Sequence, residues 1–304
     1  MFRIAASVLA VQVVTAHVAL AQIPSAPGQL VAVGGSKLHI QCTGSGAPTV
    51  ILEAGFPGSS LDWVSVQPEV AKFTRVCSYD RAGFGWSELK DSPRSTAEIS
   101  QDLQQLLTNS SVAPPYVMVG HSMGGLYVRG FTQRLPETVI GMVLVDATHE
   151  DQWDFEPKQY WEGQQLGIRP QQPPVERPGS VMKILGQMWA TEAWKTGEGR
   201  ERDSIAATVS QAQKSSRRLP AIPLVVLSAM PEVGWNDQVS VAALKAQQLQ
   251  RELAAMSPFG RWVPVAGSNH YIHLSQPAAV VEAIRQVVQA GRSMKSRPPE
   301  PSGR

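Results

Sequence analysis

Ser122 lies at the centre of the sequence Gly-His-Ser-Met-Gly, residues 120–124, which is a G-x-S-x-G element. An apolar run precedes it at residues 116–119, and a helix-like segment follows it at residues 125–131. A strand that turns sharply into a helix exposes such a serine at the carboxyl end of a sheet, where free helix N–H groups face a developing oxyanion. The element alone is equally consistent with an ordinary turn serine, but this context predicts a nucleophile.

A serine hydroxyl is a weak nucleophile near neutral pH, so Ser122 requires a base within hydrogen-bonding reach and a group that orients the base. His270 follows the last predicted strand, residues 261–265, and precedes a predicted closing helix. We expect this position at the same edge of the sheet as Ser122. His270 is therefore the predicted base, with His273 as the alternative, and His149 is expected to contact substrate.

Two strand ends offer a carboxylate that could orient His270. Asp146 directly follows the apolar run at residues 139–145, and Glu232 lies in the loop after the run at residues 222–227. A carboxylate at such a position can also cap a helix or pin a loop. We predict Asp146 as the acid, because it stands at the strand terminus itself, and Glu232 as the alternative.

Backbone N–H groups are the predicted stabilisers of the oxyanion. One is the N–H of Met123, which follows the nucleophile, and the other is the N–H of Phe56, in a glycine-rich loop after the predicted strand at residues 49–53. Loss of one such donor weakens the stabilisation of the transition state by about 3 kcal/mol.

Continuous apolar runs alternate with helix-like segments along the chain. The predicted strands cover residues 31–33, 37–42, 49–53, 75–79, 116–119, 139–145, 222–227 and 261–265. Helices are predicted at residues 63–71, after a Ser95-x-x-Glu98 capping box, and at residues 275–289. This alternation predicts an α/β fold, a mostly parallel sheet with helices on both faces, whose ligands bind beyond the carboxyl ends of the strands.

The segment at residues 149–220 is much longer than an ordinary crossover and contains four tryptophans, among them Trp153. We predict a helical cap over the site, with a disordered insertion as the alternative, and expect Trp153 to contact an apolar or aromatic part of the substrate. The core is then formed by residues 22–148 and 221–291, and residues 292–304 form a flexible tail rich in Pro, Ser and charge.

Residues 1–21 have the features of a secretory signal peptide: a basic start, a short apolar run and an A-x-A pattern ending at Ala21. We predict cleavage after Ala21 and export to the periplasm or the medium, with a buried N-terminal helix as the alternative. The apolar run is too short to span a membrane stably. In an oxidising compartment Cys42 and Cys77 could form a disulfide; two buried free thiols are the alternative.

The composition is that of a globular protein: 304 residues, 43% hydrophobic, with a formal net charge of +2. Nothing in this charge points to nucleic acid. The chain has no His/Cys cluster with the spacing of a metal site, so neither a metal nor an organic cofactor is expected. The sequence does not specify an oligomeric state.

Four segments together resemble the α/β-hydrolase superfamily. They are residues 55–58, 79–87, 120–125 and 267–270, and the resemblance runs from about residue 31 to residue 289. It implies an eight-stranded, mostly parallel sheet with a helical cap, in which the strands carrying Cys42 and Cys77 are neighbours. Two departures stand out: Ala54 replaces a common histidine, and no G-x-x-D follows residues 222–227.

The resemblance implies a secreted or periplasmic serine hydrolase that cleaves a carboxylic ester or a related acyl bond of a small molecule through an acyl-enzyme. Haloalkane dehalogenases and epoxide hydrolases of this superfamily normally have a carboxylate where Ser122 stands. A proline-type aminopeptidase or amidase is an alternative, although such enzymes usually have Trp at the position of Met123. The sequence is also consistent with a perhydrolase and with a non-enzymatic ligand-binding receptor on the same fold.

Overall fold

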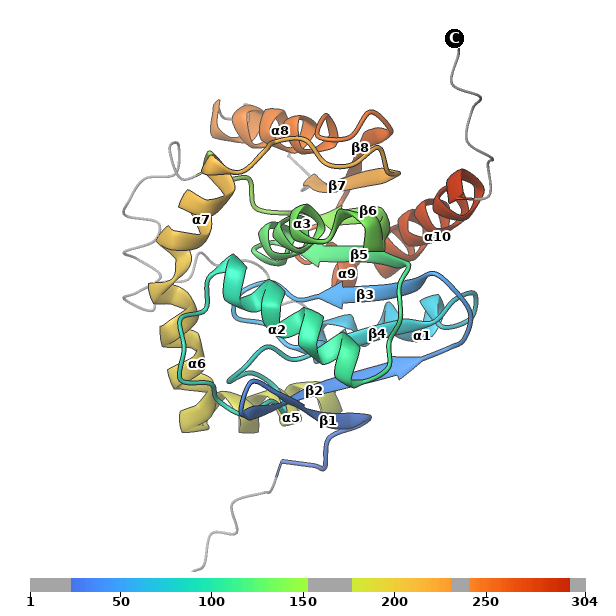
Figure 1. Cartoon of the computed structure of the whole chain (residues 1–304). Coiled ribbons are helices and arrows are strands. Elements are labelled where there is room, and N and C mark those ends of the chain that lie inside the picture. Colours follow the sequence, from blue (N-terminus) through green and yellow to red (C-terminus); the bar gives the residue numbers. More distant parts are fainter. Residues whose placement is uncertain (1–22, 153–176, 231–240, 296–304) are drawn as a thin grey trace, which may run out of the picture.

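The computed structural model describes residues 23–152, 177–230 and 241–295 (Figure 1). The predicted signal peptide therefore lies outside the described residues, as do Trp153 and Glu232. Within the described residues the chain folds around one sheet, flanked by helices, with a group of helices at one edge.

Eight strands of the described chain form a single sheet in the order β1-β2-β4-β3-β5-β6-β7-β8. The strands are β1 Gln29–Val33, β2 Ser36–Thr43, β3 Thr49–Glu53, β4 Val76–Tyr79, β5 Tyr116–His121, β6 Val139–Val145, β7 Leu224–Met230 and β8 Gly260–Ala266. The β1–β2 and β2–β4 pairs are antiparallel, and the remaining pairs are parallel. The predicted eight-stranded, mostly parallel sheet is confirmed.

Helices cover both faces of the sheet, which explains why its central strands are apolar on both sides. On one face α2 (Thr96–Asn109), α3 (Gly124–Arg134) and α8 (Val241–Ala254) share a buried apolar cluster with the strands. On the other face α1 (Gln67–Val70), α9 (Ile272–Ser275) and α10 (Pro277–Lys295) contribute to a second cluster. The capping box of Ser95 and Glu98 at the start of α2 is present as predicted.

Several predicted boundaries differ from the structure, and three of the differences have a clear local cause. The predicted helix at residues 63–71 is instead a 3₁₀ turn, η1 (Ser60–Trp63), followed by α1, because Pro68 fits only the first turn of a helix. Strand β7 begins at Leu224 rather than at residue 222, because Pro223 has no N–H to contribute to the ladder. Helix α10 continues to Lys295, past the predicted start of the tail, and Arg292 Nε donates to the Ala47 carbonyl at 2.9 Å.

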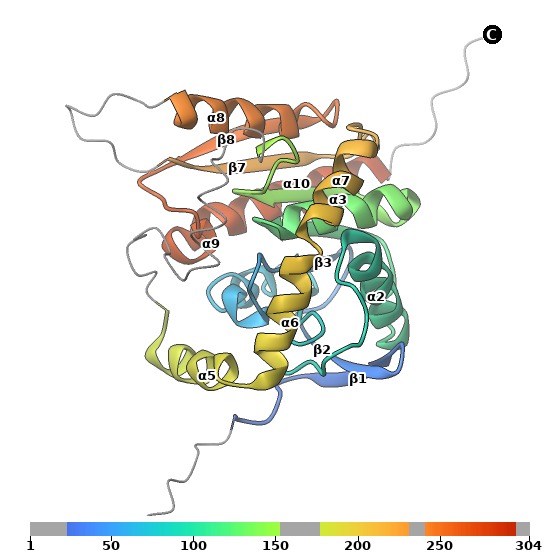
Figure 2. The ribbon, with the colours of Figure 1, turned by 90° about the vertical axis from the view of Figure 1, so that its left-hand side faces the viewer.

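The described part of the predicted cap is helical. It contains α5 (Gly179–Trp189), α6 (Glu192–Asp203) and α7 (Ile205–Lys214). In Figure 1, α6 and α7 stand at the edge towards which the arrows of β3 and β5 point. Figure 2 looks onto these helices, with α6 and α7 crossing in front of the core. The cap packs on the loop after β4: the rings of Trp194 and Phe84 meet edge to face with centroids 5.0 Å apart. A short 3₁₀ turn, η2 (Pro136–Thr138), lies in the core before β6.

Cys42 and Cys77 form a disulfide. They are direct register partners in the antiparallel β2–β4 pair, so the sheet itself brings them together. The predicted pairing is therefore confirmed. Among the described helices, none has both the length and the apolar character that crossing a bilayer requires.

Candidate active site

Ser122 occupies the sharp turn between β5 and α3, with a left-handed backbone (φ 50°). Glycine is required on both sides of it: a Cβ on Gly120 would lie 2.6 Å from the Gly124 carbonyl oxygen, and one on Gly124 would lie 2.7 Å from that of Ala54. The strained turn that the G-x-S-x-G element predicts is therefore present. The Ser122 side chain is partly exposed at the carboxyl end of the strand.

Asp146 stands at the corresponding place on the next strand, directly after β6, and also has a left-handed backbone (φ 42°). Ser122 makes backbone hydrogen bonds with residues before and after Asp146. The Ser122 N–H donates to the Val145 carbonyl at 3.2 Å, and the Thr148 N–H donates to the Ser122 carbonyl at 3.0 Å. Asp146 N–H donates to the Leu227 carbonyl of β7 at 2.8 Å. Nucleophile and acid candidates thus share one hydrogen-bonded strand edge.

His270 follows β8 and precedes α9, and its side chain is 30% exposed. Its Nδ1 donates to Asp146 Oδ2 at 2.7 Å, while Asp146 Oδ1 accepts the N–H of Ala229 at 2.9 Å. A neutral imidazole that donates through Nδ1 leaves its Nε2 as an acceptor, the form a general base needs. Of the two acids predicted from sequence, Asp146 therefore contacts His270; Glu232 is outside the described residues.

Two buried histidines pack beside His270. His121 Nε2 donates to the His270 carbonyl at 3.0 Å, and the rings of His121 and His273 lie 4.3 Å apart. Burial lowers the pKa of both side chains well below the usual value, and neighbouring imidazoles lower it further. His273, the alternative base, is fully buried, and its ring nitrogens have no hydrogen-bond partner among the described residues. The geometry favours His270.

The residues that carry the two predicted oxyanion donors are neighbours in the structure. Phe56 packs against the apolar cluster that contains Met123. In the described part of the chain, neither the Phe56 N–H nor the Met123 N–H has a hydrogen-bond acceptor. Both are thus available to a substrate oxygen. A Cβ on Gly55 would lie 3.0 Å from Ser122 Cβ, so this loop passes directly over the nucleophile.

A family model matches residues 50–283 and describes the alpha/beta hydrolase family. The chain belongs to the alpha/beta hydrolase family. Among relatives of this hydrolase, the uncharacterized protein YqjL of Bacillus subtilis (strain 168) is 25% identical over 256 residues, which cover 84% of this chain and 89% of YqjL.

Solved structures share the fold of this hydrolase at low sequence identity. A thermophilic esterase from Thermogutta terrifontis superposes with a TM-score of 0.63 at 20% identity, over 86% of this chain and 97% of the esterase. The epoxide hydrolase CorEH superposes with a TM-score of 0.64 at 16% identity, over 85% of this chain and 97% of CorEH. These likenesses show the fold alone.

Arg81 is a residue of this hydrolase whose role no sequence pattern predicts. It follows β4, is 2% exposed, and donates to the carbonyl oxygens of Ala54 and Gly55 at 2.8 and 2.9 Å, just before Phe56. The only signal in the sequence is its place in the Asp-Arg-x-Gly part of residues 79–87. Nothing in that spacing indicates which carbonyl groups it binds.

His149, predicted to contact substrate, is itself buried and lies in an ion-pair cluster with the partly exposed carboxylates of Asp151 and Glu252. Its Nδ1 accepts the N–H of Asp151 at 3.1 Å, and its Nε2 lies 3.7 Å from a carboxylate oxygen of Glu252. One ligand atom from each of these three residues falls within 4.8 Å of the others, close enough to hold a cation. Arg217, however, binds both oxygens of Asp151 at 2.8 Å, so that carboxylate already has a cation. Trp153, the other substrate contact predicted, is outside the described residues.

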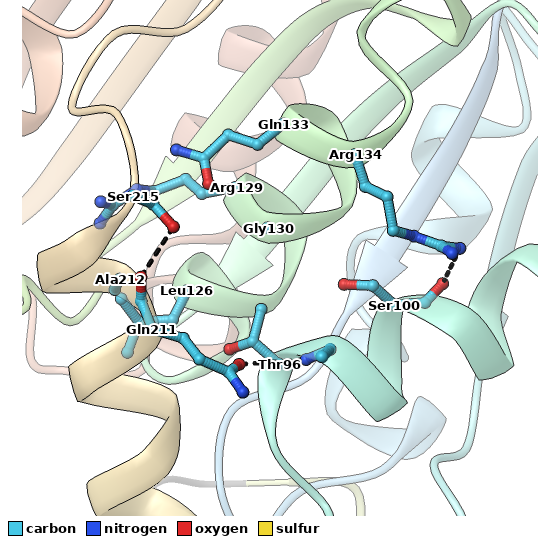
Figure 3. Close-up of a pocket in the computed structure, with 11 residues that line it drawn as sticks. Thr96, Ser100, Leu126, Arg129, Gly130, Gln133, Arg134, Gln211, Ala212 and Ser215 are labelled. Carbon is cyan, nitrogen blue, oxygen red and sulfur yellow. Dashed lines mark hydrogen bonds between the residues drawn. The ribbon is translucent and has the colours of Figure 1, made fainter.

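A pocket of about 340 Å³ lies where α7 of the cap meets α2 and α3 (Figure 3). It is lined by residues of these three helices, and neither Ser122 nor His270 is among them. Arg129, one of its lining residues, is paired with Glu150 at 2.8 Å, and Gln211 accepts the N–H of Ala97 at 3.2 Å. The pocket therefore marks the junction of cap and core in this hydrolase and is separate from the candidate active site.

Proposed function

We propose that this alpha/beta hydrolase is a serine hydrolase that cleaves a carboxylic ester or a related acyl bond through an acyl-enzyme. The observation that carries the proposal is the hydrogen bond from His270 Nδ1 to Asp146, at the strand edge that also holds Ser122. Along the chain the nucleophile Ser122 then comes first, the orienting acid Asp146 second and the base His270 last. This is the order found in the serine members of this fold.

In this mechanism His270 Nε2 takes the hydroxyl proton of Ser122 as Oγ forms a bond to the substrate carbonyl carbon. The negative oxygen of the tetrahedral intermediate accepts the N–H groups of Phe56 and Met123. Collapse of the intermediate breaks the bond to the leaving alcohol, which receives the proton from His270. Water, deprotonated by His270, then attacks the acyl-enzyme, and Ser122 leaves with the proton restored.

The fold alone does not choose among reactions, because an esterase and an epoxide hydrolase both share it. The side chain at position 122 favours one of these reactions. Epoxide hydrolases normally place a carboxylate at the nucleophile position, whereas this chain has a serine hydroxyl there. Acyl transfer through Ser122 is therefore the reaction that we propose.

Two further features of the proposal concern substrate and location. The cap and the loop after β4 form an apolar cluster rich in aromatic rings, including Trp194, Phe84 and the partly buried Phe56, which suits an apolar or aromatic acyl or alcohol group. The signal-like residues 1–21 and the Cys42–Cys77 disulfide support export to the periplasm or the medium.

The test is a panel of p-nitrophenyl esters with short and long acyl chains, assayed beside aminoacyl-anilides. The variant is Ser122→Ala, and the matched control is Ser275→Ala on the exposed side of α9. We expect wild type and control to hydrolyse esters alike and Ser122→Ala to lose at least about 10⁴-fold in kcat. Retained activity in Ser122→Ala would rule out the mechanism. Faster cleavage of anilides than of esters would favour the aminopeptidase alternative, and no turnover at all would favour a ligand-binding receptor.

A further inference from the structure

A buried ion pair joins the cap to the core behind the candidate oxyanion loop. Glu201, on cap helix α6, has no exposed surface, and its two carboxylate oxygens accept Nε–H and an Nη2–H of Arg81, each at 2.9 Å. This two-bond arrangement fixes the relative orientation of both side chains. Tyr127, on α3 behind Ser122, also donates to Glu201 at 3.0 Å.

The same guanidinium has three further acceptors on the core side. Nη1 donates to Glu53 at 2.7 Å and to the Ala54 carbonyl at 2.8 Å, and Nη2 donates to the Gly55 carbonyl at 2.9 Å. A guanidinium has five N–H donors, so every donor of Arg81 has an acceptor. Arg81 therefore cannot turn towards or away from the cap without losing a bond to the loop.

The Gly55 carbonyl matters because it belongs to the same peptide unit as the Phe56 N–H. A peptide unit is planar, and in its trans form the C=O and N–H bonds point in opposite directions. The peptide bond between Gly55 and Phe56 is trans. A hydrogen bond that holds the Gly55 oxygen towards Arg81 thus directs the Phe56 N–H away from Arg81, towards the side where the oxyanion would form.

We propose that Arg81 and Glu201 are positioning residues that couple the docking of cap helix α6 to the orientation of the Phe56 oxyanion donor. The inference rests on the proposed function, since it assigns Phe56 to the transition state of acyl transfer. With α6 docked, Glu201 holds the guanidinium, and the guanidinium holds the Gly55–Phe56 peptide. When the hydrogen bonds between Glu201 and Arg81 are lost, the Gly55–Phe56 peptide can rotate, and the Phe56 N–H no longer points at the oxyanion.

Close packing makes the coupling rigid. Gly197 on α6 lies against Gly83, where an added Cβ on Gly83 would come within 2.7 Å of Gly197 Cα. The Arg81 guanidinium also faces the rings of Phe84 and Tyr127 at 5.3 Å each. Lysine at position 81 would keep the charge but lack the planar set of donors that reaches Glu201 and Gly55 together.

The test compares ester hydrolysis with hydrolysis of the matching thionoester, in which sulfur replaces the carbonyl oxygen and accepts hydrogen bonds poorly. The variants are Glu201→Gln and Arg81→Lys. The matched control is Glu192→Gln, on the same helix, whose exposed carboxylate pairs with Lys195. We expect the first two variants to lose about 10- to 100-fold in kcat on the ester, with KM within threefold, because misorientation removes part of what one donor contributes.

The ratio of ester to thionoester turnover separates positioning from a merely structural role. We expect this ratio to fall at least fivefold in Glu201→Gln and Arg81→Lys and to stay at the wild-type value in Glu192→Gln. An equal loss on both substrates, or no loss, would overturn the coupling. If either variant does not fold, Tyr127→Phe, which removes only the hydroxyl contact with Glu201, should lower the ratio in the same direction, and an unchanged ratio would overturn it. A wild-type protein that cleaves neither substrate would overturn the proposed function and the coupling with it, whereas an active wild type with unaltered variants would overturn the coupling alone.

Discussion

His270 and Asp146 are joined by a hydrogen bond of 2.7 Å between Nδ1 and Oδ2, and the second oxygen of Asp146 is held by the Ala229 N–H at 2.9 Å. The carboxylate is therefore fixed from the side of β7 while it orients the imidazole. This relationship favours Asp146 as the acid of the proposed mechanism, and it leaves Nε2 of His270 as an acceptor.

Asp146→Asn tests this assignment. The amide still accepts the Ala229 N–H, but its NH₂ group cannot accept from Nδ1, so the imidazole favours the wrong tautomer. We expect kcat to fall by about 10⁴-fold with the fold intact, as is general for such tautomer-breaking changes. Ester hydrolysis should be measured beside Glu232→Gln, which we expect to retain most activity. The reverse result would assign the acid to Glu232.

Gly55→Ala tests the close approach of the oxyanion loop to the nucleophile. The new Cβ would lie 2.7 Å from His121 Nδ1 and 3.0 Å from Ser122 Cβ, and His121 is itself bonded to the His270 carbonyl. The loop must therefore shift, and we expect kcat to fall by about 10²-fold or more. Gly186→Ala, in α5 with open space around it, is the control, and should stabilise the protein by about 0.5–1 kcal/mol without affecting kcat. Equal activity of the two variants would contradict the geometry.

The disulfide is expected to stabilise the fold rather than to take part in the reaction. Cys42 and Cys77 are 35 residues apart in sequence, and closing a loop of that length stabilises a protein by about 4 kcal/mol in the chain-entropy account. The double variant Cys42→Ala/Cys77→Ala should lose this amount in urea unfolding and keep kcat within about twofold. Treatment of the wild type with a reductant should lower stability equally. Unfolding curves that coincide before and after reduction would count against the prediction.

Glu53 gives the stability of the protein a specific dependence on pH. Its carboxyl group is fully buried, and burial raises its pKa to about 7, against the opposing effects of Arg81 and of the Tyr79 hydroxyl. The folded state thus keeps the proton to higher pH than the unfolded state. As pH rises from about 4.5 to 7, the unfolded chain loses this proton first, and the free energy of unfolding falls by about 3 kcal/mol from this group.

Glu53→Gln removes this ionisation and keeps an amide oxygen for Arg81. As pH rises from 5 to 8, the free energy of unfolding of Glu53→Gln should therefore increase relative to that of the wild type, by about 2–3 kcal/mol. Urea unfolding of both proteins at the two pH values measures the difference. A difference that stays constant with pH, or that changes in favour of the wild type, would show that Glu53 does not hold its proton in the folded state.

Much of the fold follows from local signals in the sequence. The apolar runs locate the strands because strands of a parallel sheet are buried on both faces, and two of the boundary errors fall where prolines at 68 and 223 interrupt helix or strand pairing. The positions of Ser122 in the turn after β5 and of Phe56 in the loop after β3 could also be predicted, because both segments depend on glycines whose spacing is visible in the sequence; the oxyanion role of Phe56 and Met123 stays a prediction.

Long-range pairing is the part that local patterns could not supply. Asp146 and His270 are 124 residues apart, and the choice between Asp146 and Glu232 depends on which strand end faces His270. Arg81 and Glu201 are 120 residues apart, so neither the ion pair nor its hold on Gly55 has any sequence signature. The substrate contact of His149 stays a prediction; its burial and its approach to Glu252 could not be read from its place at the start of the cap.

The nucleophilic role of Ser122 is the central claim, and labelling with a fluorophosphonate tests it most directly. Attack by Ser122 Oγ on phosphorus expels fluoride and leaves a stable adduct, so intact mass spectrometry and peptide mapping report the reacting residue without any knowledge of the natural substrate. The account predicts one adduct, on the peptide that carries Ser122, absent in Ser122→Ala and much slower to form in His270→Ala. A folded wild-type protein that stays unmodified at Ser122 under conditions that label a known serine esterase would contradict it.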